Sequence, residues 1–183
     1  MKAIDRRIIL ETYPFNVEQL NLEKNGVAYS EPYYRLVSKD WVNVLPITDD
    51  GRAVLIRQPR AGVLKSILET PGGIIEDGEK DPTLTAAREL EEETGFTSQR
   101  FLSLGSLYTN PAILTNRCHF FLAMGCRLAA QRQHFPDVDE DIEVELFDVA
   151  ALDSMVRTAQ IDHSLSALCI LLAGKYLNVP LRP

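Results

Sequence analysis

The chain has few cysteines, and their spacing shows no covalent or metal framework. Only Cys118, Cys126 and Cys169 occur among the 183 residues, and no two of them form a CxxC pair. An odd count without close spacing excludes a disulfide scaffold and argues against a zinc site. We therefore expect a protein of the reducing cytoplasm, in which these cysteines are small buried residues.

Long apolar runs and an excess of basic residues are also missing. No stretch has the roughly 20 apolar residues that cross a bilayer, and the N-terminal segment is too polar for a secretory signal. The 19 Lys and Arg against 26 Asp and Glu give a net charge of -7, without a basic stripe for nucleic acid. We expect neither a membrane nor a nucleic-acid partner. An anionic small substrate would need metal ions and a few arginines to offset the negative field.

The order of patterns along the chain predicts two parts. Residues 1–40 consist of short β-rich runs, with a hairpin signal at Asn25-Gly26 and too few apolar residues for independent stability. From Trp41 onward, strand and helix patterns are both present, and the 45% hydrophobic content of the chain suits a packed core. We therefore predict an N-terminal β arm over residues 1–40 and a main domain over residues 41–183.

Two longer helices, with a short helix over residues 149–157 between them, are predicted within the main domain. For the first, Asp81-Pro82 provides an N-cap and a first-turn proline, and Gly95 provides the end. We expect its buried face to consist of Leu84, Ala87 and Leu90. The second is predicted over residues 162–177, with a buried stripe of Leu165, Leu168, Leu172 and Tyr176.

The first helix also carries three glutamates on one face. Glu89, Glu92 and Glu93 stand at positions i, i+3 and i+4. Like charges at this spacing repel one another, and hard divalent cations such as Mg²⁺ prefer oxygen ligands. The glutamate face therefore predicts a metal site, for which a solvated charged face is the simpler alternative.

The stretch around these glutamates resembles the signature of the Nudix hydrolase family. Nine positions match it: Gly73, Glu79, Arg88, Glu89, Leu90, Glu92, Glu93, Gly95 and Phe96. Eight residues separate Glu79 from Arg88, one more than in the family pattern. We place the extra residue in the loop at residues 80–82, because the spacing from Arg88 onward is intact.

Other segments resemble the branch of this family that cleaves ADP-ribose and related nucleoside diphosphate sugars. They are Arg57-Gln58-x-Arg60, Leu68-Glu69, the turn at residues 160–162, and Pro111, which stands 16 residues after Gly95. The segment after Pro111 lacks the glycine and the acid common in ADP-ribose enzymes, so the resemblance does not fix that substrate.

The resemblance implies a fold and an activity. The fold is an α/β sandwich of the Nudix type, α/β/α, with a mixed central sheet and a small antiparallel N-terminal β arm. The arm would mediate a homodimer and contribute substrate contacts. The activity is metal-dependent hydrolysis of nucleoside diphosphate sugars to a nucleoside monophosphate and a sugar phosphate. The alternatives are a nucleoside triphosphate pyrophosphohydrolase and a non-catalytic nucleotide-binding module.

The resemblance also implies roles for residues near the helix. Glu89, Glu92 and Glu93, with the carbonyl of Gly72, would hold Mg²⁺ or Mn²⁺. Arg88 would pair with one of these glutamates and orient it. Glu79 would support the loop.

Substrate contacts and the general base are assigned by the same resemblance. Arg57 and Arg60 would contact the diphosphate or the terminal sugar phosphate. Pro111 marks a substrate loop, Arg117 contacts either the substrate or an acidic neighbour, and Glu69 contacts either the substrate or a buried amide. Glu140 is the preferred general base and Asp139 the second candidate, and a helix glutamate, Glu89 or Glu92, is the alternative.

Overall fold

We describe the protein from a computed structural model, which describes residues 1–136 and 141–177. The chain divides into two compact units. The small unit comprises residues 1–40 and 107–118, and the large unit comprises residues 41–106 and the chain from residue 119 onward. The expected N-terminal arm lies in the small unit, which also takes in the segment 107–118 that the sequence pattern assigned to the main domain.

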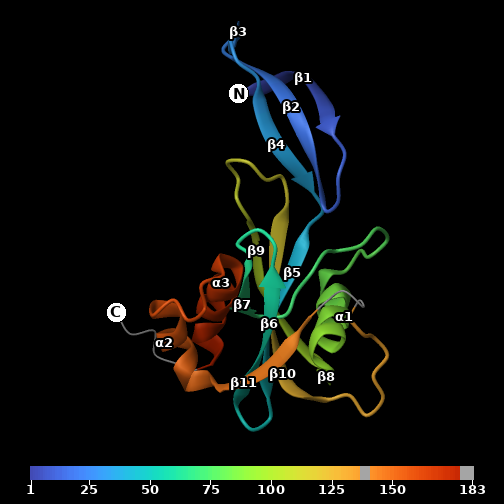
Figure 1. Cartoon of the computed structure of the whole chain (residues 1–183), viewed down its shortest axis with the longest axis vertical. Helices are drawn as coiled ribbons and strands as arrows, with labels where there is room; N and C mark the ends of the chain where they lie inside the picture. Colours follow the sequence, from blue (N-terminus) through green and yellow to red (C-terminus); the bar gives the residue numbers. More distant parts are fainter. Residues whose placement is uncertain (137–140, 178–183) are drawn as a thin grey trace. The chain divides into compact units, whose positions relative to one another are not determined.

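The large unit is built on a seven-stranded sheet (Figure 1). Its strands are β5 (Trp41–Thr48), β6 (Arg52–Arg60), β7 (Lys65–Glu69), β8 (Phe96–Thr97), β9 (Arg100–Tyr108), β10 (Arg117–Leu128) and β11 (Glu143–Asp148). The order across the sheet is β11-β6-β5-β10-β8, with β7 beside β6 and β9 beside β10.

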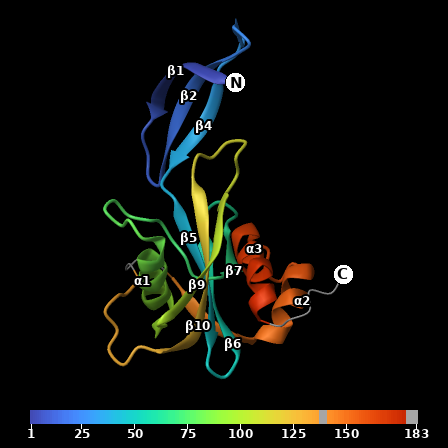
Figure 2. The ribbon, with the colours of Figure 1, turned by 180° about the vertical axis from the view of Figure 1, so that it is seen from behind.

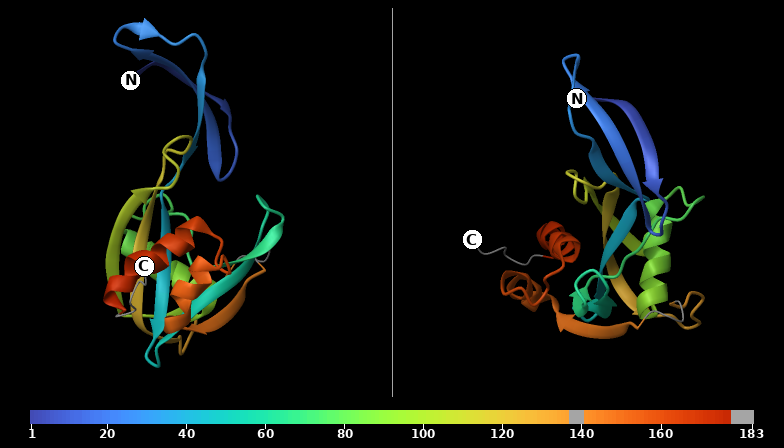
Figure 3. Two further views of the ribbon diagram at one scale, coloured as in Figure 1. Left: turned by 90° about the vertical axis from the view of Figure 1, so that its left-hand side faces the viewer. Right: turned by 45° about the horizontal axis from the view of Figure 1, so that its top comes forward.

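Helices cover both faces of this sheet (Figures 1 and 2). They are α1 (Pro82–Thr94), α2 (Leu152–Arg157) and α3 (Ser164–Ala173), with short 3-10 turns at Val149–Ala151 and Gly174–Tyr176. α1 lies on one face and α2 and α3 lie on the other, as Figure 3 also shows, and both α1 and α3 contact β5. None of the helices that the structure describes has the length and apolar character needed to span a membrane.

The predicted ends of α1 are confirmed, but its predicted buried face is partly wrong. The Asp81 carboxylate accepts a hydrogen bond from the Thr83 N–H at 2.9 Å, and Gly95 ends the helix in the left-handed conformation with φ 74°. Leu84 is 66% exposed. The buried face instead comprises Thr85, Ala86, Glu89, Leu90, Glu91, Glu93 and Thr94. Apolar periodicity missed this face because several of its members are carboxylates with partners in the fold.

The predicted stripe on the C-terminal helix is also wrong. The buried residues of α3 are Ser166, Cys169, Ile170 and Ala173. The helix is apolar on nearly every side, so the pattern of leucines alone does not identify the packed face. Small residues face the sheet and allow close approach. The Cys169 sulfur lies 3.8 Å from the Asn43 carbonyl oxygen and 3.6 Å from that of Phe121.

The small unit is an antiparallel sheet with a loop paired to it. Its strands are β1 (Lys2–Leu10), β2 (Phe15–Lys24), β3 (Val27–Ala28) and β4 (Tyr33–Ser38), and β2 pairs with the other three. Asn25 and Gly26 have φ values of 54° and 79°, so the predicted hairpin turn is confirmed. The Leu36 N–H donates to the Ile113 carbonyl at 2.7 Å, which joins the 109–116 loop to β4.

Candidate active site

A short extended segment, Pro71–Gly73, is held along β5. The Val42 N–H donates to the Gly73 carbonyl and the Val44 N–H donates to the Pro71 carbonyl, each at 2.8 Å. Successive residues of an extended chain turn their polar groups to opposite edges. The N–H and carbonyl of Gly72 therefore point away from β5.

The outward side of Gly72 meets the end of α1. Its N–H donates to Glu93 Oε2 at 2.8 Å. On the other side, a Cβ added to Gly72 would lie 2.3 Å from the Val42 carbonyl oxygen. Only glycine fits, because the backbone of β5 occupies the space of a side chain.

Gly73 is required for a different contact. A Cβ at this position would lie 2.5 Å from Glu89 Oε1 and 2.6 Å from its carboxyl carbon. The Glu89 carboxylate therefore occupies the place of a side chain on Gly73. The two glycines bring the backbone of this segment against two helix carboxylates.

The Arg88 guanidinium binds three carboxylates at once. Arg88 Nε lies 3.1 Å from Glu79 Oε1, Nη2 lies 2.8 Å from Glu89 Oε1, and Nη1 lies 2.8 Å from Glu92 Oε2. Arg88 also donates to the Ile74 carbonyl at 3.3 Å. Arg88 therefore fixes the direction of three carboxylates and ties them to the segment that follows the glycines.

The charges in this cluster stabilise one another. Burial alone would lower the pKa of Arg88, but the carboxylate of Glu89, followed by those of Glu79 and Glu92, raises it. Burial would raise the pKa of Glu79, yet hydrogen bonds from the Glu76 N–H, Arg88 and Thr85 lower it overall. Arg88 and Glu79 therefore stay ionised at neutral pH.

The donor chemistry of the cluster fits a hard divalent cation, because its side chains offer carboxylate oxygens. In the described parts of the chain, residues 1–136 and 141–177, no group of three or more His, Cys, Asp or Glu side chains is arranged to hold a metal ion. The reason is visible in the contacts: Glu89 and Glu92 turn to Arg88, and Glu93 turns to the Gly72 N–H. Because an ionised carboxylate has two oxygens with several lone pairs, each of these side chains can keep its present partner and still bind an ion.

The candidate substrate residues of the large unit pair with carboxylates. Arg57 Nε lies 2.6 Å from Glu145 Oε1. Arg60 binds Glu69 through two bonds, of 2.8 and 2.9 Å, and Glu69 is 1% exposed. Arg60 and Glu69, which were assigned separately from the sequence, are thus direct partners. His163 Nδ1 lies 3.3 Å from Glu69 Oε2.

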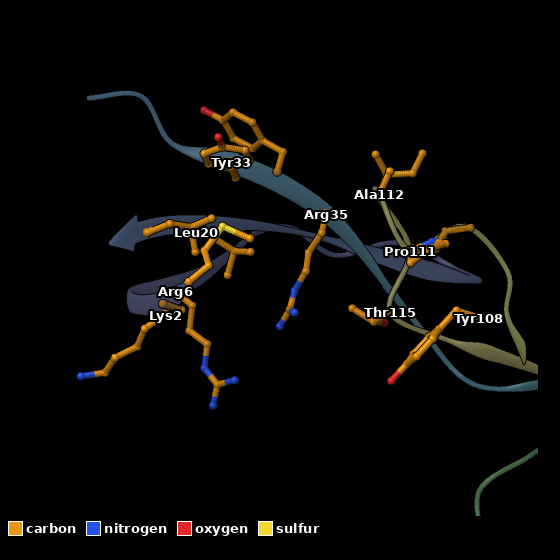
Figure 4. Close-up of a pocket in the computed structure, with 15 residues that line it drawn as sticks. Lys2, Arg6, Leu20, Tyr33, Arg35, Tyr108, Pro111, Ala112 and Thr115 are labelled. Atoms are coloured by element: carbon orange, nitrogen blue, oxygen red, sulfur yellow. The ribbon is translucent and has the colours of Figure 1, made fainter. Parts of the chain in front are cut away.

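The other candidates lie in the small unit. Pro111 lines a cavity of about 540 Å³, whose walls include the cations Lys2, Arg6 and Arg35 and the tyrosines Tyr33, Tyr34 and Tyr108. In the view of Figure 4, the Arg35 side chain lies between those of Arg6 and Tyr108. The Arg117 guanidinium stacks 4.5 Å from the centre of the Tyr108 ring, and the Arg117 N–H donates to Asp40 at 2.8 Å. Glu140 and Asp139 lie outside the described residues.

Two sets of contacts around the cluster were not expected from the sequence. Arg132 donates to the Glu92 carbonyl at the C-terminal end of α1, and the Gln133 N–H donates to Glu91 Oε1 at 2.5 Å. Thr70 contacts both Asn43 and Ser166. None of these partners is close in sequence. The feature of the sequence that singles out Thr70 is its position directly before Pro71 and the two glycines.

The sequence of the chain was compared with protein families and with known proteins. The model of the NUDIX domain matches residues 38–168. An ADP-ribose pyrophosphatase from Bacillus subtilis (strain 168) is 36% identical over 114 residues, which cover 62% of this chain and 60% of that protein. A methanol dehydrogenase activator from Bacillus methanolicus is 37% identical over 108 residues, covering 59% and 56%. The chain thus spans less than two thirds of the length of these two relatives.

A solved structure shares the fold across nearly the whole chain. It is described as the crystal structure of an ADP compounds hydrolase, with a TM-score of 0.83 and 22% identity, and the match covers 97% of this chain and 94% of that one. The expected fold, an α/β Nudix-type sandwich with a mixed central sheet and a small antiparallel arm, is confirmed.

Proposed function

Because this chain belongs to the NUDIX domain family, we propose that it hydrolyses the pyrophosphate bond of nucleoside diphosphate sugars to a nucleoside monophosphate and a sugar phosphate. The observation that carries the proposal is the packing of Glu89 and Glu93 against Gly73 and Gly72, with Arg88 beside them. The similarity to an ADP-ribose pyrophosphatase from Bacillus subtilis supports this substrate class.

We assign Glu89, Glu92, Glu93 and the Gly72 carbonyl to binding Mg²⁺ or Mn²⁺. When bound, the ion would neutralise charge on the diphosphate and lower the pKa of the attacking water. Arg88 orients the carboxylates through the contacts described above, and Glu79 holds Arg88 from the other side.

The remaining roles are proposed from position and chemistry. The side chains of Arg57 and Arg60 are 36% and 43% exposed, and partly exposed arginines of this kind can bind a diphosphate or sugar phosphate. Glu69 is almost fully buried, which favours a role in orienting Arg60. Glu140 is proposed as the general base, and Asp139, Glu89 and Glu92 remain the alternatives.

The small unit is proposed to mediate a homodimer. β1 ends the sheet order, and its apolar side chains Ile4, Ile8, Ile9 and Leu10 are 51%, 40%, 44% and 54% exposed. An exposed apolar edge strand invites pairing with another chain unless something covers it. Sedimentation should give the mass of two chains at micromolar concentration, and a single-chain mass would contradict the assignment.

The small unit is also proposed to contact substrate. The cavity lined by Lys2, Arg6, Arg35 and Tyr108 combines cations with aromatic rings, which suits the phosphates and base of a nucleotide. Pro111 lines the same cavity, and the Arg117 guanidinium stacks on Tyr108, which also lines it. These positions support the assignment of both residues to substrate binding. The expected compartment is the cytoplasm, which is supported by the burial of the three cysteines, none of them in a disulfide within the described residues.

The activity is tested by a product screen with the purified chain. ADP-ribose, GDP-mannose, UDP-sugars and dinucleotides are incubated with Mg²⁺ or Mn²⁺, and the phosphate products are identified. We expect a nucleoside monophosphate and a sugar phosphate, and we expect EDTA to abolish their formation. Release of pyrophosphate from a nucleoside triphosphate, or no turnover of any substrate, would contradict the proposal.

Two matched variants test the metal assignment. Glu92→Gln removes one proposed ligand and should lower turnover by about 100-fold or more. Glu91→Gln, on the same helix, removes one charge but keeps an oxygen that can accept the Gln133 N–H bond, so turnover should stay near that of the unmodified protein. Equal turnover in the Glu92→Gln variant and the unmodified protein would refute the metal role of Glu92.

A further inference from the structure

A buried polar network lies directly before the two glycines. The Thr70 N–H donates to Ser166 Oγ at 3.0 Å, and the Thr70 hydroxyl donates to Asn43 Oδ1. The two hydroxyl oxygens of Thr70 and Ser166 are 3.2 Å apart. Thr70, Ser166 and Asn43 are 1%, 0% and 6% exposed. Buried polar groups of this kind are costly unless each has a partner, so the network favours one arrangement of the chain.

This network controls the backbone that enters Gly72. Thr70 precedes Pro71, which has no N–H to donate, so the Thr70 N–H is the last backbone donor before Gly72. Asn43 lies on β5, and its Cα and Nδ2 are both 3.0 Å from the position that a Cβ on Gly72 would take. The partners of Thr70 therefore fix the chain before Gly72 and the surface on which Gly72 rests.

The network also connects the two faces of the sheet. Ser166 belongs to α3, whereas Glu93 belongs to α1 on the opposite face (Figure 3). Thr70 is held by Ser166, and Gly72, two residues later, donates to Glu93 Oε2 at 2.8 Å. A change in the direction of the chain at Thr70 would move the Gly72 N–H and carbonyl relative to that carboxylate.

We infer that Thr70 and Ser166 are positioning residues, which hold the Gly72 backbone at the distance from Glu93 that ion binding requires. The inference rests on the proposed function, because it assumes that Gly72 and Glu93 hold a divalent ion. It adds that α3, which supplies none of the proposed ligands, influences the affinity of the site through the Ser166 hydroxyl, which binds Thr70.

The test compares variants that differ by one hydroxyl. Thr70→Val keeps the shape of the side chain but leaves Asn43 Oδ1 without its donor, whereas Thr70→Ser keeps the hydroxyl. Ser166→Ala removes the other hydroxyl and serves if Thr70→Val fails to fold. The matched control is Thr48→Val. Thr48 is also buried, at 9% exposed, and its hydroxyl binds Asp50 and the backbone of Arg52 in the turn after β5.

The readout is the affinity for Mn²⁺ without substrate, measured from the spin-resonance signal of the free ion, together with the unfolding temperature. Removing groups that orient metal ligands costs about 10–100-fold in affinity, so we expect about 10-fold weaker binding for Thr70→Val and for Ser166→Ala. Thr70→Ser should restore the affinity. Thr48→Val should lower the unfolding temperature without changing Mn²⁺ binding.

The outcomes separate the inference from the proposed function. If the unmodified protein binds Mn²⁺ and Thr70→Val binds it equally well, the inference is overturned, whatever the unfolding temperature of the variant. If Thr48→Val weakens binding as much as Thr70→Val does, the effect is one of general stability and the inference also fails. If the unmodified protein binds no Mn²⁺, the proposed metal site itself is refuted, and the inference with it.

Discussion

Gly72 and Gly73 are neighbours, yet alanine at each position should disturb a different property. A Cβ on Gly72 would lie 2.3 Å from the Val42 carbonyl oxygen and 3.0 Å from the Asn43 Cα, both atoms of the β5 backbone. A Cβ on Gly73 would instead meet the carboxylate of Glu89, at 2.5 to 2.8 Å. A backbone in the middle of a sheet moves with difficulty, whereas the end of a side chain can rotate.

These distances give the expected sizes of the effects. Gly72→Ala must push β5 away by about 1 Å, and overpacking of this kind costs about 1–3 kcal/mol of unfolding free energy. Gly73→Ala displaces Glu89 from Arg88, where the two side chains are 2.8 Å apart. Loss of the contact between Glu89 and Arg88 costs about 1.5 kcal/mol of unfolding free energy. This cost is partly offset because alanine leaves the unfolded chain fewer backbone conformations than glycine does. Because one carboxylate is misplaced by about 1 Å, turnover should fall by about 100-fold.

The assay combines urea unfolding with turnover of ADP-ribose, or of the best substrate from the screen. Gly72→Ala should lose the more stability, and Gly73→Ala should lose turnover with a small change in stability. Gly62→Ala is the control, because a Cβ there meets nothing within 4 Å. Full turnover in Gly73→Ala would refute the placement of Glu89 against Gly73. A Gly72→Ala variant as stable as the control would refute the contact with β5.

Three further predictions concern charge. The pKa of Glu79 is lowered from 4.5 in the folded protein. Its contribution to stability is therefore complete above pH 4.5 and is lost as the pH falls through the pKa of the folded state. Glu79→Gln should flatten the acid limb of a plot of unfolding free energy against pH. Burial lowers the pKa of His163 from 6.5, so the unfolded chain takes up the proton first and stability should decline as the pH drops below 6.5; unfolding temperatures of His163→Gln should lack this decline. Arg60→Met leaves the buried Glu69 carboxylate without its guanidinium, which should cost about 3 kcal/mol, and Glu69→Gln in the same chain should recover part of that loss in a double-mutant cycle.

The parts of the fold that depend on local chemistry were predictable from the sequence. Asp81 and Pro82 start α1 and Gly95 ends it, because capping and the left-handed conformation depend on the residues at those positions alone. Asn25-Gly26 specified its hairpin turn for the same reason. The family and fold followed from nine matched positions around α1.

The parts that depend on partners distant in sequence were not predictable in the same way. Leu84 is exposed although it is apolar, because α1 turns its carboxylates inward, where Arg88 and the Gly72 N–H receive them. Arg60 and Glu69 are not opposite one another in β6 and β7, because Ile56 lies opposite Glu69 and Arg60 lies opposite Lys65. Their pairing depends on the reach of two long side chains and does not follow from the strand pattern of the sequence. Ser166 lies within an apolar helix, so the sequence pattern did not single it out; its burial and its contact with Thr70 show that it faces the sheet.

The segment Gly72–Gly73 has a consequence for how the protein can change over evolution. It contributes no side chain, and its neighbours on one side are backbone atoms of β5. A substitution there can only obstruct the fit, whereas substitutions in the surrounding elements can be absorbed if they leave these backbone positions in place. Divergence should therefore collect around the segment and spare it. A structural relative with a TM-score of 0.83 at 22% identity has the kind of sequence drift that such a backbone-defined centre allows.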